Sequence, residues 1–118
     1  MALWYVDNTA SGANNGTSWT DAWQTIASIN YASVNAGDTI YISGGSTSKT
    51  YNESFALPLS GTAGNLITIS TGQDAGHNGI VIMNNSSDWL AAGNLAYVHI
   101  TGNVNGARNM NVTGTGWR

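Results

Sequence analysis

The stretch GDTIYISGG at residues 37–45 decides the fold, because the pattern of the chain changes there. Within it Ile40 and Ile42 alternate with residues that tolerate water, which is the period of two that a half-buried strand requires. The two glycines at its end supply turn chemistry. We therefore predict a strand over residues 39–43, with both isoleucines facing the core and Tyr41 facing outward.

Similar short segments run through the rest of the chain, each followed by a turn rich in Gly or Asn. Short strands with such turns build a sandwich, a barrel or a solenoid. Repetition favours the solenoid, because LITIS at residues 66–70 and YVHIT at residues 97–101 share one pattern 31 residues apart. The predicted strands cover residues 3–8, 39–43, 53–57, 66–70, 79–83, 89–92, 97–101 and 109–113.

One helix is predicted before these strands. Its apolar stripe has helical spacing and consists of Trp19, Ala22, Trp23, Ile26 and Ile29. A serine at position 18 and an acid at position 21 fit a capping pattern at its start. We expect a helix of about 11 to 13 residues, near the usual mean length, that ends before residue 37.

Four segments together resemble the opening of the right-handed parallel β-helix proteins, the pectate-lyase-like family that includes polysaccharide lyases and tailspike-type fibres. They are YVDN at residues 5–8, GTSWTDAW at 16–23, AGDTIYISGG at 36–45 and GTAGNLITI at 61–69. The resemblance covers nearly the whole chain. It is fairly specific for the fold and weak for function, because lyases, hydrolases, adhesins and fibres share this opening.

The resemblance implies an all-β, right-handed parallel β-helix of about two coils with one N-terminal capping helix. Residues 1–118 then form one module, with the strand and capping helix in residues 1–37 and the coils in residues 38–118. Such a short β-helix is expected to be part of a longer protein or of an assembly. No cofactor is predicted from the residues; Ca²⁺ is implied by the resemblance only.

The composition excludes several classes of partner. Only 8% of the residues are charged, the net charge is −3 and there are three basic residues. Nucleic acids and anionic membranes are therefore excluded as partners, because both are bound through lysine and arginine side chains. Cysteine is absent, which excludes disulfides and thiolate metal sites. Gly, Asn, Thr and Ser contribute 55 of the 118 residues, 47%. This composition suggests an extracellular or cell-surface protein, although the first residues, MALWY, lack the features of a signal peptide.

No catalytic or metal-binding set emerges from the spacing of the polar residues. The only interior cations, Lys49 and Arg108, are 59 residues apart, and the six acids are scattered. Glu53 and Asp88 begin corresponding strands, but strand-end acids are usually solvated. His77, in a turn, lacks the companions that a zinc site needs. We therefore predict no catalytic residue and no metal ligand in this chain, which leaves an enzymatic role to a longer protein, as a polysaccharide lyase.

Aromatic side chains are the candidates for ligand binding, since flat rings stack on sugars. The outward positions of the predicted strands give Tyr41 and Tyr97, and Trp89 begins another strand. These three residues are the predicted sugar contacts. Trp19 and Trp23 lie on the apolar helical stripe and are assigned to the core.

Two functions remain open from the sequence. The chain is the non-catalytic N-terminal module of a secreted carbohydrate-active β-helix protein that resembles polysaccharide lyases. Alternatively, it is a structural or adhesive β-solenoid, such as a fibre or tailspike-like module, that assembles with itself. The second follows from the last predicted strand, whose edge and apolar residues are exposed if nothing covers them. We expect a homo-oligomer formed around Met110, Val112 and Trp117.

Overall fold

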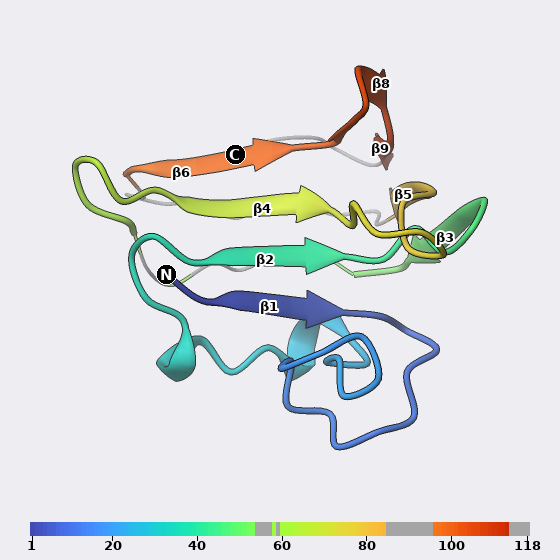
Figure 1. Ribbon diagram of the computed structural model, residues 1–118, viewed down its shortest axis with the longest axis horizontal. Coiled ribbons are helices and arrows are strands. Elements are labelled where there is room, and N and C mark those ends of the chain that lie inside the picture. The colour runs from blue at the N-terminus through green and yellow to red at the C-terminus, as the bar shows by residue number, and fades with distance from the viewer. Residues whose placement is uncertain (54–57, 59, 85–95, 114–118) are drawn as a thin grey trace.

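The computed structural model describes residues 1–53, 58, 60–84 and 96–113, the side chains of residues 111–113 excepted. Four parallel strands form sheet A in the order β1-β2-β4-β6, and Figure 1 shows them side by side and pointing the same way. Their bounds are Leu3–Val6 for β1, Thr39–Ile42 for β2, Ile67–Thr71 for β4 and Val98–Thr101 for β6.

A second parallel sheet, sheet B, has the order β3-β5-β9. Its strands are Ser48–Tyr51, Ile80–Asn84 and Met110–Thr113. A two-stranded antiparallel hairpin, β7 (Asn103–Val104) and β8 (Ala107–Arg108), lies between β6 and β9 in the chain. The predicted strands at residues 39–43, 66–70, 79–83, 97–101 and 109–113 thus agree with β2, β4, β5, β6 and β9 to within one residue at each end.

The core lies between the two sheets, because inward residues of both sheets belong to one buried cluster. Ile40 and Ile42 are fully buried, as their alternation in the sequence predicts. Tyr51 of β3 is also buried, and its hydroxyl donates a 2.8 Å hydrogen bond to the carbonyl oxygen of Ser43. Burial first, and then the nearby charge of Asp7, raises the pKa of the Tyr51 phenol, so that it stays protonated as a donor.

The predicted N-terminal helix is wrong. In its place the structure has two 3-10 turns of three residues each, η1 (Ile26–Ser28) and η2 (Tyr31–Ser33). The reason is that Trp23 pairs with the outer edge of β1: its amide donates to the carbonyl of Tyr5, and its carbonyl accepts from the amide of Asp7, each at 2.9 Å. A residue that uses its backbone in this way cannot form the hydrogen bonds of a helix interior.

The predicted burial of the stripe is correct for four of its five residues: Ala22, Trp23, Ile26 and Ile29 are buried without a helix. The carboxylate of Glu53 accepts the amides of Ile26 and Ala27 at 3.0 and 3.2 Å, and it thereby satisfies the start of η1. Glu53 is therefore engaged with backbone amides; Asp88, the other acid predicted at the start of a strand, lies outside the described residues.

The predicted fold class is also wrong. The prediction is a right-handed parallel β-helix of about two coils with one N-terminal capping helix, whereas the described residues have only short strands and no capping helix. They form a small compact body, measuring 33 × 30 × 28 Å, in which short parallel strands are joined by crossovers in the manner of α/β proteins. The predicted strands at residues 53–57 and 89–92 lie wholly or mostly outside the described part.

Candidate functional site

The outward face of sheet A carries a row of aromatic and hydroxyl side chains. The parallel register places Tyr5 beside Tyr41, Tyr41 beside Ser70, and Ser70 beside Thr101. Neighbouring strands lie about 4.8 Å apart, so side chains at equal register contact one another. Sequence alternation predicts that Tyr41 faces outward; the register adds Tyr5 as its neighbour.

The row continues beyond the strands as a chain of ring contacts, which we call the aromatic strip (Tyr41, Tyr5, Trp19 and His77). The ring centroids of Tyr41 and Tyr5 are 5.9 Å apart, and the ring of Tyr5 meets Trp19 edge-on at 4.8 Å. Trp19 in turn stacks on His77 with centroids 4.0 Å apart and planes 3° from parallel. Such contacts fix the orientation of each ring more tightly than apolar burial does.

The strip ends at the carboxyl edge of sheet A, where the segments after β1, β2 and β4 meet. Asp7 follows β1, Ser43 follows β2, and His77 lies in the turn between β4 and β5. A close approach of two glycines holds these segments together, because a Cβ built on Gly44 would lie 2.0 Å from the carbonyl oxygen of Gly79. Only glycine fits at position 44, and the approach lets the Gly44 amide bond to the carbonyl of His77 at 2.9 Å.

Asp7 is the charged centre of this edge. Its carboxylate lies 2.9 Å from the Lys49 ammonium, and it accepts the amide and the hydroxyl of Thr9 at 3.0 and 2.9 Å. Burial by itself would raise the pKa of Asp7, but Lys49 and the Thr9 hydrogen bonds outweigh it, so the pKa lies below its usual value. The carboxylate is therefore ionised at neutral pH and paired.

His77 places one ring nitrogen against two partners. Its Nδ1 is 2.9 Å from the Ser43 hydroxyl oxygen and 3.4 Å from the second carboxylate oxygen of Asp7. A Ser-His-Asp triad needs the serine and the acid on opposite ring nitrogens, and here both are on the same one. Ser43 is moreover buried, and its oxygen accepts the Gly45 amide at 3.1 Å. These three side chains form a positioning network for the imidazole and not a nucleophile with its base.

An open pocket of about 270 Å³ lies beside the imidazole, and we call it the rim pocket. Its polar lining consists of Asp7, Thr9, Ser11, Thr20 and His77, and the Trp19 indole forms part of its wall. The indole cannot turn freely, because its Nε1 donates a 2.8 Å hydrogen bond to the Asp74 carboxylate. The pocket thus combines a fixed aromatic surface with hydroxyl, imidazole and carboxylate groups.

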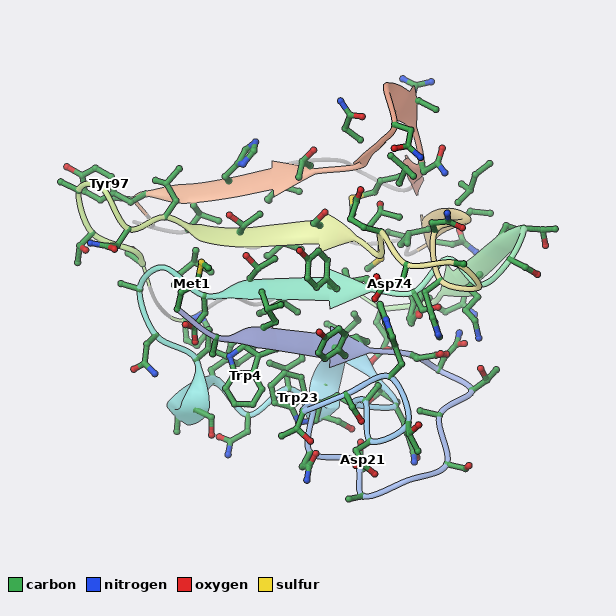
Figure 2. The ribbon with its side chains drawn as sticks, in the orientation of Figure 1. Met1, Trp4, Asp21, Trp23, Asp74 and Tyr97 are labelled. Carbon is green, nitrogen blue, oxygen red and sulfur yellow. The ribbon has the colours of Figure 1, made fainter. Side chains whose placement is uncertain are left out.

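Two of the three predicted sugar contacts, Tyr41 and Tyr97, lie apart in the structure. Tyr41 lies in the aromatic strip, whereas Tyr97 precedes β6 at the opposite end of sheet A. In Figure 2, Tyr97 is labelled on the left and Asp74, which bonds to Trp19 of the strip, on the right. Tyr97 is 51% exposed and has a φ of 56°, a left-handed conformation that is uncommon for an aromatic residue. Trp89 lies outside the described residues.

Sequence reasoning missed three members of the strip. Trp19 was assigned to the core and His77 to a surface turn, but each is partly buried against the other. They are 58 residues apart, and no spacing rule joins them. Tyr5 could have been found from the sequence, because its alternation with Val6 predicts that it faces outward. Parallel pairing of its strand with residues 39–43 then places it beside Tyr41.

The predicted self-association residues are only partly placed. Met110 is half-buried and packs against the core cluster. The side chain of Val112 and all of Trp117 lie outside the described part.

Across the described ranges no three His, Asp or Glu side chains are grouped so that they could hold a metal ion. Among the same residues there is no helix with the length and apolar character that a membrane crossing requires. No protein-family model matches this sequence, and a comparison with curated proteins finds no significant similarity.

Proposed function

We propose that this chain is a non-catalytic carbohydrate-binding module of a secreted, glycan-active protein, and that it binds sugar along the aromatic strip and in the rim pocket. The observation that carries the proposal is that the aromatic strip runs without a break into the rim pocket. The outward tyrosines of β1 and β2 lead, ring by ring, to an indole that forms the wall of a pocket with a polar lining.

The chemistry of this surface suits a sugar. A pyranose offers apolar C–H faces, which stack on aromatic rings, and hydroxyls, which donate to carboxylates and exchange hydrogen bonds with serine and threonine. Tyr41 and Trp19 are both half-buried, so part of each ring remains open to a ligand while its neighbours hold it in place. Ring orientation fixed before binding reduces the entropy lost on association.

The polar groups of the rim pocket do not form the pair of carboxylates that sugar hydrolysis needs. Glycoside hydrolysis needs two carboxylates about 5 to 9 Å apart, one of them protonated. Among the described residues that line the pocket, Asp7 is the one carboxylate, and its lowered pKa and its pairing with Lys49 make it a poor proton donor.

The proposal is tested by titrating the chain with a panel of soluble oligosaccharides and following tryptophan fluorescence and heat. Tyr41→Ala should weaken binding at least tenfold, because it removes the outermost ring of the strip. Tyr97→Ala is the matched control, since it removes an exposed tyrosine at the other end of the sheet and should leave affinity unchanged. Equal effects of the two substitutions, or no binding by any member of the panel, would show the proposal to be wrong.

Self-assembly is the second candidate, and an asymmetry between the sheet edges favours it. The outer edge of β1 is covered, because Tyr5 donates to the carbonyl of Gly16 and accepts from the amide of Trp23. At the other end, β6 and β9 each pair with a single neighbouring strand within the described residues. Two copies that meet through the β6 and β9 edges would form a two-fold dimer, and the covered β1 edge disfavours head-to-tail stacking along sheet A.

Sedimentation velocity over a wide concentration range tests this second candidate. A dimer whose population rises with concentration is expected, and Met110→Lys should shift it to monomer. Because Met110 contacts the core, circular dichroism must show that the variant is folded. A chain that stays monomeric at high micromolar concentration would exclude the dimer.

A further inference from the structure

The β7–β8 hairpin projects from the carboxyl end of β6 and is held rigidly. Asn105 and Gly106 at its tip have φ angles of 49° and 85°, the two positive values of a type I′ turn. At its base, the side-chain amide of Gln73 donates to the carbonyl oxygens of Thr71 and Asn103, each at 3.0 Å. The hairpin is thereby tied to the end of β4, and its side chains are presented in a fixed geometry.

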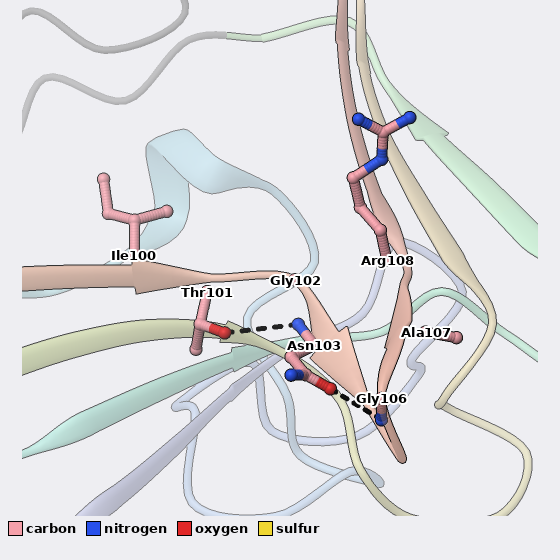
Figure 3. Close-up of a pocket in the computed structure, with 7 residues that line it drawn as sticks. All are labelled: Ile100, Thr101, Gly102, Asn103, Gly106, Ala107 and Arg108. Atoms are coloured by element: carbon pink, nitrogen blue, oxygen red, sulfur yellow. Dashed lines mark hydrogen bonds between the residues drawn. The ribbon is translucent and has the colours of Figure 1, made fainter.

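A second open pocket, of about 300 Å³, lies between this hairpin and the end of β6 (Figure 3). Its polar side chains are Thr101, Asn103 and Arg108, and the remainder of its lining is apolar or glycine. Asn103 and Arg108 are register partners of β7 and β8, and Figure 3 shows the Arg108 side chain extended away from those of Asn103 and Thr101, so it has to turn toward them to share a ligand. None of the described residues that line the pocket is acidic.

Each side-chain oxygen of this lining already accepts one hydrogen bond from the hairpin's backbone. The Oδ1 atom of Asn103 accepts the Gly106 amide at 2.8 Å, and the hydroxyl oxygen of Thr101 accepts the Asn103 amide at 3.2 Å; Figure 3 marks both bonds. Because both donors are backbone N–H groups, the side-chain roles follow without ambiguity. The Asn103 amide nitrogen and the Thr101 hydroxyl hydrogen are left as donors.

Arg108 adds a charge that the described residues do not neutralise. The other cation of this part of the chain, Lys49, is paired with Asp7 and also bonds to Asn8 and Thr9. Arg108, by contrast, is exposed, and the described residues offer it no ion pair and no hydrogen bond. Guanidinium presents a planar set of donors that matches the two oxygens of a carboxylate, and it matches phosphate and sulfate as well.

We propose that this pocket binds an oxyanion, a carboxylate, sulfate or phosphate group, through Arg108 with Asn103 and Thr101 as supporting donors. The guanidinium brings a positive charge and most of the free donors of this lining, so an anion is favoured over a neutral hydroxyl. The volume is at the lower end of that of small-molecule pockets, about 300 Å³, which is more than a lone oxyanion needs. The bound group therefore belongs to a larger molecule.

The inference is tested by nuclear magnetic resonance titration of the whole chain with sodium acetate, sulfate and phosphate, with chloride holding the ionic strength constant. Saturable shifts of the Arg108 side-chain N–H and of the backbone amides of residues 101–108 are expected. Arg108→Gln should weaken binding at least tenfold, and Arg108→Lys should restore part of it, since it keeps the charge without the planar fork. Arg118→Gln is the control, because it makes the same change in net charge.

Non-saturable shifts, or equal weakening by Arg108→Gln and Arg118→Gln, would overturn the inference, since both indicate charge attraction without a site. Arg108 has no contact to lose among the described residues, so its variants should fold, which circular dichroism checks. A sulfated or carboxylated oligosaccharide then identifies the source of the anion. If Tyr41→Ala weakens its binding, one glycan contacts both the pocket and the aromatic strip; if not, the oligosaccharide binds at the pocket alone. Both results support the pocket, and neither depends on whether neutral sugars bind to the aromatic strip.

Discussion

Replacing Asp7 by Asn should destabilise the protein strongly, because it leaves the Lys49 ammonium without its counter-charge. The two groups are 2.9 Å apart, and their side chains are only 7% and 15% exposed. Removing one partner of a buried ion pair costs about 3 to 5 kcal/mol. Lys49 keeps its bonds to Asn8 and Thr9, so the lower end applies, about 3 kcal/mol.

A double-mutant cycle separates the ion pair from the hydrogen bonds of Asp7. Lys49→Met removes the charge and keeps the packing of the chain's methylene groups. In the double variant neither charge is buried alone, so its loss of stability should be smaller than the sum of the single losses by about 1 to 3 kcal/mol. The free energies come from urea unfolding followed by tryptophan fluorescence at neutral pH.

Asp74→Asn serves as the matched control, with the same change of charge at an exposed carboxylate that makes one hydrogen bond, to Trp19. It should cost about 1 kcal/mol or less. The argument is refuted if Asp7→Asn costs no more than this control, or if the cycle gives a coupling energy near zero. Either result would mean that water screens the pair despite its low exposure.

Three further outcomes follow from the same contacts. The folded-state pKa of Asp7 is lowered, so the stability that this carboxylate contributes is complete above the pKa of the unfolded chain, about 3.9, and is lost as pH falls through the folded pKa. When the free energy of unfolding is measured against falling pH, Asp7→Asn should therefore lose less stability than the unmodified protein. Asp38→Ala should cost about 3 kcal/mol in urea unfolding, because the carboxylate accepts two backbone amides and an indole N–H at 2.8 to 2.9 Å. Gly16→Ala should lower the thermal midpoint more than Gly64→Ala; both glycines have φ near +78°, but a Cβ at Gly16 would lie 2.6 Å from an indole ring and one at Gly64 meets nothing. Equal shifts would contradict this last account.

The strands could be predicted from the sequence because their alternation is local. The alternation of Ile40 and Ile42 with Tyr41 is enough to predict which face of β2 is inward, and the two isoleucines are indeed buried. The helix could not be predicted correctly, because its apolar stripe is equally compatible with an irregular segment packed on the core. What decides between them is a long-range demand: the outer edge of β1 needs a partner, and Trp23 supplies it.

The candidate site could be predicted only where strand alternation suffices. That places Tyr41 outward, but it does not bring Trp19 to His77, whose contact depends on how two connecting segments fold back. The hairpin at residues 103–108 was likewise missed, although its Asn-Gly pair is a strong hairpin signal. The glycine and asparagine after residue 101 were interpreted as a simple turn, so the two short strands that follow were not predicted.

Parallel topology explains why the polar chemistry gathers where it does. All strands of sheet A end at one edge, so the segments that follow them meet there, whatever their separation in sequence. This brings Asp7, Ser43 and His77 together at the rim pocket, and it places the hairpin with Arg108 after the end of the neighbouring strand. Gln73 links the two sites, because it lies in the turn that carries His77 and bonds to the base of the hairpin. Gln73→Ala removes this tie, so it should loosen the hairpin and weaken oxyanion binding in the nuclear magnetic resonance titration, while the Asp7–Lys49 ion pair of the rim pocket stays intact.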